Sequence, residues 1–107
     1  MRSSFRAVLV TAPDVKTAEK LARGLVEAKL AACVNVVSGV VSHYRWHGKL
    51  CRDREVLLVI KTRAPLFSAL KRFVKDNHPA KVPEIVALPI LEGSRDYLAW
   101  LSQETRP

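Results

Sequence analysis

The sequence contains only two cysteines and no long apolar run. Cys33 and Cys51 lack the CxxC spacing of a zinc site, and two cysteines are too few for the disulfide framework of a small secreted protein. No apolar segment approaches the ~20 residues that a membrane-spanning helix requires. The opening residues, Met1 to Phe5, lack the apolar region and cleavage site of a signal peptide. These absences predict a cytoplasmic protein with reduced thiols and no membrane partner.

The sequence also lacks a complete set of catalytic residues or metal ligands, so residue chemistry alone does not name a function. Its composition is that of a globular protein, with 49% hydrophobic and 26% charged residues in 107. That length predicts a single domain over residues 1–107. The net charge of +8 permits an anionic ligand, an acidic partner or nucleic acid, but a solvated basic surface is the simpler explanation.

Three helices are predicted from apolar residues that recur at helical spacing. The first follows Asp14, whose carboxylate can cap the free amides of the first turn. The second begins near Pro65, where the missing N–H costs nothing, and ends at His78-Pro79. The third is short and follows Ser94. The inward-facing stripes are Ala18, Leu21, Ala22, Leu25 and Val26 in the first helix, Leu66, Leu70, Phe73 and Val74 in the second, and Tyr97, Leu98 and Leu101 in the third.

Strand patterns cover Phe5 to Ala12, a long segment between residues 31 and 63, and Val82 to Ile90. The long segment is predicted to be one hairpin that bends at Ser38-Gly39 and reverses at Gly48. The last strand contains two prolines, which cannot donate to a ladder, so we expect it at an edge of the sheet. The order β-α-β-β-α-β plus a terminal helix predicts an α+β, ferredoxin-like fold with two helices on one face of an antiparallel sheet.

The predicted hairpin is too long for the body that carries it. Fully extended, residues 31–47 would reach about 58 Å, whereas a 100-residue domain has a radius of gyration of about 13 Å. A lone two-stranded ribbon is marginal in water, and this one carries Tyr44 and Trp46. We therefore predict a closed homo-oligomer in which these two aromatic side chains form part of the interface core.

Seven short segments, taken together, resemble the CutA family of divalent-cation tolerance proteins. The resemblance implies a ferredoxin-like homotrimer, related in architecture to the PII signalling proteins, whose long hairpins wrap around the neighbouring subunits. It also implies a role in tolerance of copper and other divalent metals, with no established enzymatic activity. The segments follow the family's order over about residues 8 to 103 and are Thr11–Asp14, Leu30–Asn35, Tyr44–Lys49, Lys61-Thr62, His78-Pro79, Val82–Ile85 and Tyr97–Trp100.

The sequence departs from the family pattern near the implied inter-subunit cleft. The family commonly reads His-Pro-Tyr, whereas this chain has Ala80 after His78-Pro79. A cysteine and a histidine assigned to metal binding in copper-tolerance members are replaced by Val10 and Asn77. His78 remains as a matching ligand type for copper or another divalent metal, with Cys33 as a plausible companion. The alternative is structural: His78 caps the helix or lines the cleft, and Cys33 is a small core residue.

Lys61 and Glu84 each lie in an otherwise apolar strand, and charges are seldom fully buried unless they are paired. We predict that they pair with each other or across the subunit boundary, near His78 and Trp100. Either they form a salt bridge that fixes the trimer, or they belong to a cleft that responds to a metal ion or a small anion.

Two other function classes share this element order. An acylphosphatase-like enzyme would need a glycine-rich, arginine-bearing loop after the first strand, but Thr11–Asp14 has neither residue and carries a carboxylate that would repel phosphate. An RNA-binding module would need aromatic side chains on the central strands, where Leu9 and Leu58 are typical of the aliphatic residues found. Nucleic acid is therefore not expected as a partner.

Overall fold

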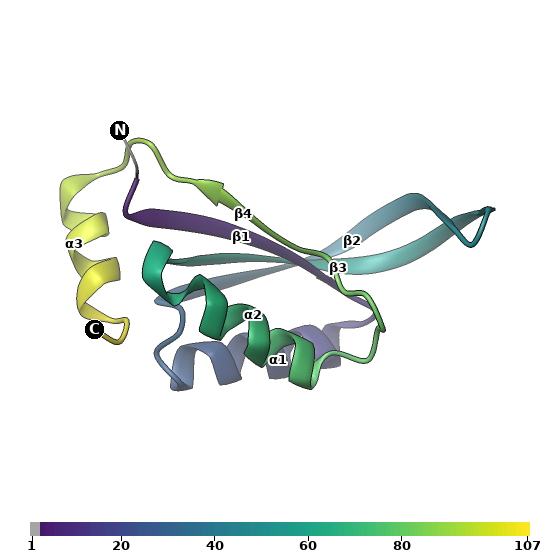
Figure 1. Cartoon of the computed structure of the whole chain (residues 1–107), viewed down its shortest axis with the longest axis horizontal. Helices are drawn as coiled ribbons and strands as arrows, with labels where there is room; N and C mark the ends of the chain where they lie inside the picture. Colours follow the sequence, from purple (N-terminus) through teal and green to yellow (C-terminus); the bar gives the residue numbers. More distant parts are fainter. Residues whose placement is uncertain (1–2) are drawn as a thin grey trace.

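The computed structural model describes residues 3–107, so Met1 and Arg2, and with them part of the expectation about the start of the chain, lie outside it. Four strands form one sheet in the order β2-β3-β1-β4, and every neighbouring pair is antiparallel. The ferredoxin-like fold predicted from the sequence is confirmed (Figure 1). The elements are β1 (Phe5–Ala12), α1 (Val15–Glu27), β2 (Cys33–Trp46), β3 (Lys49–Arg63), the 3-10 turn η1 (Ala64–Leu66), α2 (Phe67–Asn77), β4 (Ile85–Pro89) and α3 (Arg95–Gln103).

Helices α1 and α2 cover one face of the sheet, and the core lies between them and the strands (Figure 1). The predicted cap of α1 is confirmed, since the Asp14 carboxylate accepts the Thr17 N–H at 2.7 Å. Thr62 is a fully buried polar side chain, and it donates its hydroxyl to the Leu30 carbonyl at 2.6 Å. The buried side chains that meet in the core are Val8, Val10, Ala12, Ala18, Leu21, Leu25, Leu30, Ala31, Val56, Leu58, Ile60, Leu70 and Val74.

Strands β2 and β3 form the predicted long hairpin, which projects beyond the helical layer (Figure 1). The bend expected at Ser38-Gly39 is a bulge, because Val37 pairs with Leu57 and Val40 with Glu55. The reversal uses His47 and Gly48, both with positive φ (49° and 77°). Two left-handed residues in a two-residue loop match the twist of the flanking strands, so the turn continues the ribbon without splaying it.

The sheet face opposite α1 and α2 is apolar and only partly covered. On this open face the side chains of Val37, Val86 and Leu88 are 44%, 46% and 50% exposed. Tyr44 and Trp46 lie on the same side of the sheet. Their partners in β3 are Cys51 and Lys49. These two residues point to the same side of β3 as half-buried Leu57, Val59 and Lys61. The sheet therefore buries one face within the chain and leaves the other available.

The last strand is shorter than predicted. It runs over Ile85–Pro89 instead of Val82 to Ile90, although its expected position at an edge of the sheet is confirmed. Pro83 lacks an N–H and restricts the residue before it, so the segment before Ile85 is a loop. Within residues 3–107, no helix is both long and apolar enough to cross a lipid bilayer.

Helix α3 lies at one end of the sheet, and the segment after it is fastened to the body (Figure 1). The Thr105 hydroxyl donates to the Leu101 carbonyl at 3.0 Å and receives a hydrogen bond from Arg63 Nε at 2.9 Å. The next backbone N–H, that of Arg106, donates to the Lys29 carbonyl at 2.9 Å. These bonds join the end of the chain to β3 and to the residues that follow α1.

Candidate functional site

A cavity of about 730 Å³ lies between the distal hairpin and the loop that precedes β4. We call it the hairpin cavity. Its volume falls within the range of small-ligand sites, and its polar lining includes all three histidines of the chain and two glutamates. The lining residues are Thr11, Ser42, His43, Tyr44, Trp46, His47, Glu55, His78, Ala80, Lys81, Val82, Pro83 and Glu84.

His78 lies in this cavity with both ring nitrogens engaged. Nδ1 accepts the Ala80 N–H at 3.0 Å, so the ring proton is assigned to Nε2, which donates to the Thr11 carbonyl at 2.7 Å. The residue follows α2 directly and ties the start of the loop to the end of β1. A metal ion at either nitrogen would have to replace one of these hydrogen bonds.

Two aromatic side chains from the hairpin form another wall of the cavity. Tyr44 and Trp46 are 41% and 45% exposed, and the Trp46 ring meets His47 edge-on at 4.8 Å. The Tyr44 hydroxyl donates to the Asp53 carboxylate across the ribbon, and this hydrogen bond raises the pKa of Tyr44 to about 12. Aromatic residues are enriched in protein interfaces, so this wall of the cavity is suited to contact another protein chain.

The ion pair expected between Lys61 and Glu84 is not formed within the chain. The Lys61 ammonium donates to the Asn35 side chain, whereas Glu84 lies in the loop that lines the hairpin cavity. Among residues 3–107, the salt bridge that does form joins Arg23 and Glu27 on the surface of α1, at 3.4 Å. Pairing within one chain was wrong because Lys61 is in register with Ala7, whereas Glu84 lines the hairpin cavity with Thr11, at the other end of β1. Pairing across a subunit boundary stays a prediction.

Cys33 lies at the Lys61 end of the sheet, next to helix α3, which carries Tyr97 and Trp100. Cys33 pairs with Lys61 across the hairpin. Burial raises the pKa of the Tyr97 hydroxyl, and the neighbouring Cys33 thiol adds to the rise. The Tyr97 ring in turn lies 5.5 Å from that of Trp100. Trp100 therefore lies with Tyr97 and Cys33 at the α3 end of the sheet, whereas His78 lies at the Thr11 end of β1.

One chain does not bring Cys33 and His78 to the same ion. Cys33 is in register with Lys61 and Ala7, whereas His78 contacts Thr11, four residues further along β1. Four strand residues span about 13 Å. In the described part of the chain, no group of three His, Cys, Asp or Glu side chains could hold a metal ion. The residues of a single subunit therefore do not fit the metal that the family resemblance implies.

Three residues of these sites were not predicted to be site residues, although Asn35 and Tyr97 lie in segments that resemble the family. They are Asn35, which accepts from Lys61, Asp53, which accepts from Tyr44, and Tyr97, which lies beside Cys33. Strand alternation could have indicated Asn35, because it lies two residues from Cys33 and so shares its face. The contact of Asp53 depends on the register of the hairpin, and that of Tyr97 depends on how α3 docks on the sheet. The local periodicity of the sequence predicts neither.

The sequence and the fold of this chain are similar to those of known proteins of one family. The chain matches the family described as CutA1 divalent ion tolerance protein over residues 6–104. The divalent-cation tolerance protein CutA of Thermus thermophilus is 53% identical over 98 residues, which cover 92% of this chain and 95% of that protein. The chloroplastic CutA protein of Arabidopsis thaliana is 50% identical over 99 residues, and this chain spans only 54% of its length.

Solved structures agree with the sequence comparison. The structure of the divalent cation tolerance protein CutA1 from Thermus thermophilus superposes with a TM-score of 0.94 at 51% identity, covering 95% of this chain and 99% of that one. None of these names is that of an enzyme. The family match over most of the residues, the close relatives and the shared hairpin fold place this chain in the CutA1 divalent ion tolerance protein family.

Proposed function

We propose that this protein acts without catalytic turnover, as a homotrimer that binds a divalent cation, copper being the first candidate, or a small ligand at a cleft between subunits. The names of its relatives support a role in divalent-cation tolerance. The family resemblance of the motifs supports three subunits with interlocking hairpins. The site would contain Tyr44, Trp46 and Glu84 from the hairpin cavity, together with Lys61 and Trp100 at the α3 end of the sheet.

The open face of the sheet is the observation that carries this proposal. It presents exposed Val37, Val86 and Leu88 beside half-buried Leu9 and Val59. Removing apolar surface from water contributes about 25 cal/mol per Å², so covering this face with another copy would stabilise the assembly. Contiguous apolar surface of this kind marks an interaction site in a water-soluble protein.

The two edges of the sheet favour a ring over a two-fold dimer. One edge is β2, which continues into the long ribbon, and the other is the short strand β4. A β2 edge laid on a neighbour's β4 edge makes a head-to-tail contact, and head-to-tail contacts close into rings when the rotation allows it. This geometry supports a cyclic trimer.

The donor types in the hairpin cavity support a divalent cation as the ligand. Imidazole and carboxylate groups are good ligands for first-row transition metals, and thiolate suits copper in its reduced state. Within one chain, over the residues described, these donors do not converge. A site that contains both His78 and Cys33 would form only if the hairpin cavity of one copy meets the α3 end of another, which is why we place it between subunits.

We propose the cytoplasm as the location. Both cysteines, Cys33 and Cys51, are free thiols, which suits a reducing compartment. The compartments named for relatives differ, since the Arabidopsis protein is chloroplastic and a CutA structure from Archaeoglobus fulgidus is described as periplasmic. Fractionation of the source cells tests the assignment: recovery with a cytoplasmic marker is expected, and recovery with an extracytoplasmic marker would overturn it.

Two measurements on the purified protein test the assembly and the ligand separately. Native mass spectrometry should give three times the chain mass of 12.0 kDa, and a monomer at micromolar concentration would end the trimer proposal. Copper titration calorimetry should show binding that weakens about tenfold in His78→Ala, as expected for a lost ligand contact worth about 1.4 kcal/mol. His43→Ala, in the same cavity, is the matched control. Equal heats in the wild type and His78→Ala would remove His78 from the site.

A further inference from the structure

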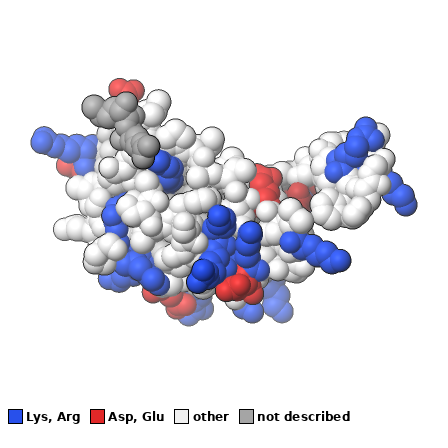
Figure 2. Space-filling view, in the orientation of Figure 1, with Lys and Arg blue, Asp and Glu red and all other residues white. Residues whose placement is uncertain are grey.

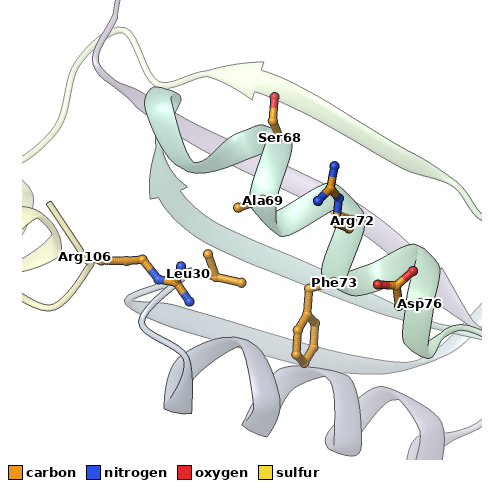
Figure 3. A pocket seen from close by; sticks show the side chains of 7 residues that line it. All are labelled: Leu30, Ser68, Ala69, Arg72, Phe73, Asp76 and Arg106. Atoms are coloured by element: carbon orange, nitrogen blue, oxygen red, sulfur yellow. The ribbon is translucent and has the colours of Figure 1, made fainter.

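A second cavity lies on the helical side of the molecule, away from the open face of the sheet (Figure 3). Its volume is about 460 Å³, and we call it the helix groove. It is lined by Leu30, Ser68, Ala69, Arg72, Phe73, Asp76 and Arg106. None of these residues takes part in the function proposed above, so the groove requires an explanation of its own.

One side of the helix groove is apolar, formed by Leu30 and Phe73. Leu30 is only 4% exposed, and Phe73 reaches from α2 toward α1 (Figure 3). There its ring lies against Gly24, so close that a Cβ at this position would come within 2.6 Å of Cζ. The glycine therefore fixes the ring as one side of the groove, where a planar apolar group could stack.

Arg106 is held at the rim of the groove by three hydrogen bonds. Its N–H donates to the Lys29 carbonyl at 2.9 Å, its Nε donates to the Ala28 carbonyl at 3.0 Å, and its own carbonyl accepts from Arg63. These bonds position the guanidinium beside Leu30 (Figure 3). The Nη1 and Nη2 atoms make no hydrogen bond within residues 3–107, so a fork of donors is positioned in advance of any ligand.

Arg72 adds a second positive charge from α2, although its guanidinium points away from that of Arg106 (Figure 3). Asp76 lies one turn further along the helix, the spacing at which an ion pair can form, but within the described residues Arg72 has no salt bridge. The groove therefore carries two guanidinium groups against one carboxylate. Lys and Arg side chains are also frequent on the surrounding helical surface (Figure 2). This balance attracts anions and repels cations.

We propose that the helix groove binds a small organic anion, with a carboxylate at the Arg106 guanidinium, a flat apolar body against Phe73 and Leu30, and Arg72 adding positive charge from α2. Guanidinium forks match carboxylate geometry and form the stronger, charge-assisted hydrogen bonds. The size of the cavity suits a ligand of one or two rings. The proposal is independent of the trimer and of the metal ligand, because it uses neither the open face nor the hairpin cavity.

Benzoate and its uncharged counterpart benzamide test this proposal on the intact protein. In heteronuclear NMR titrations, benzoate should shift the backbone amide signals of Ala69, Phe73 and Arg106 in a saturable way. Benzamide should bind about tenfold more weakly, because it lacks the negative charge that strengthens hydrogen bonds to a guanidinium. Equal affinities, or shifts that map to the open face of the sheet instead, would overturn the proposal.

Variants at Arg72 separate the groove from non-specific attraction to a basic protein. Arg72 is exposed and makes no hydrogen bond in the described chain, so Arg72→Gln should keep the fold. We expect it to weaken benzoate about twofold and leave benzamide unchanged, with Arg72→Lys close to the wild type because the positive charge remains. Arg52→Gln, an exposed arginine on the hairpin, is the matched control. Equal loss in both variants would show that only net charge matters and would refute the groove.

Discussion

His78 Nε2 lies 2.7 Å from the Thr11 carbonyl and closes a bridge between the loop after α2 and the end of β1. The other ring nitrogen accepts the Ala80 N–H, so a neutral imidazole holds this wall of the hairpin cavity. Replacing His78 by alanine should lower the free energy of unfolding by about 1–2 kcal/mol, because both hydrogen bonds of the ring are lost. Urea denaturation at fixed protein concentration measures the change.

The matched control for that experiment is His43→Ala, because His43 is exposed. Substitutions at exposed positions usually change stability by less than about 0.5 kcal/mol. If both variants were equally stable, the bridge from His78 to Thr11 would not contribute to folding, and the role of His78 would have to lie in ligand binding.

The contact between Gly24 and Phe73 makes a second prediction. Gly24→Ala should destabilise the protein by about 1–3 kcal/mol, because the new methyl group would overlap the ring at 2.6 Å. This loss opposes the gain of about 1 kcal/mol that alanine normally brings to a helix. Thermal denaturation measures it. In a Phe73→Leu background the same change should be neutral or stabilising, and an unchanged penalty there would contradict the steric explanation.

The two tyrosines of the chain should both ionise at a higher pH than a free tyrosine. The hydrogen bond to Asp53 raises the pKa of Tyr44 to about 12, and burial raises the pKa of Tyr97. Ultraviolet absorbance during alkaline titration should therefore show less tyrosinate at pH 10 than two free tyrosines would give. Asp53→Asn should return one of the two transitions toward the ordinary pKa of about 10, while Tyr97→Phe should remove the other.

The same hydrogen bond gives the hairpin a pH dependence of known sign. Because the pKa of Tyr44 is higher in the folded state, its contribution to stability is fully present below pH 10 and is lost as the pH rises toward 12. The wild type and Asp53→Asn should thus converge in stability at high pH. A difference that grew with pH would contradict the assignment.

A charge on the open face should disrupt the proposed assembly. Leu88 is 50% exposed on that face, and a lysine there would be buried without a partner once a second copy covered it. Sedimentation should then show a shift of Leu88→Lys from trimer to monomer. Leu50→Lys is the matched control, since Leu50 is 79% exposed near the turn of the hairpin, on the other alternation of β3. A trimeric Leu88→Lys would place the interface elsewhere.

Much of the fold followed from local patterns. Strand alternation and the glycines at positions 39 and 48 predicted the bulge and the reversal, and two prolines predicted the edge strand. The start of β4 was misplaced because Val82 has strand propensity, while Pro83 next to it breaks the ladder. Here the strand propensity of Val82 favours a longer strand, but the missing N–H of Pro83 prevents the ladder from extending, so the strand begins at Ile85.

The sites were less predictable because they depend on distances across the sheet. Lys61 and Glu84 are both charges in apolar surroundings, but strand register places one beside Asn35 and the other in the hairpin cavity. Likewise, Trp100 was assigned to the vicinity of His78, whereas the docking of α3 sets it by Tyr97. Register and helix docking are tertiary properties, and the spacing of residues in the chain does not contain them.

The bulge in β2 bends the hairpin without changing which side of it each later residue faces. Ser38 and Gly39 stand opposite the single residue Val56, yet the pairs before and after them keep the same sidedness. Deleting one bulge residue would straighten the arm while Tyr44 and Trp46 stayed on their original side. Relatives can therefore adjust the angle at which the arm leaves the body by one insertion or deletion, without redesigning the surface that the arm carries.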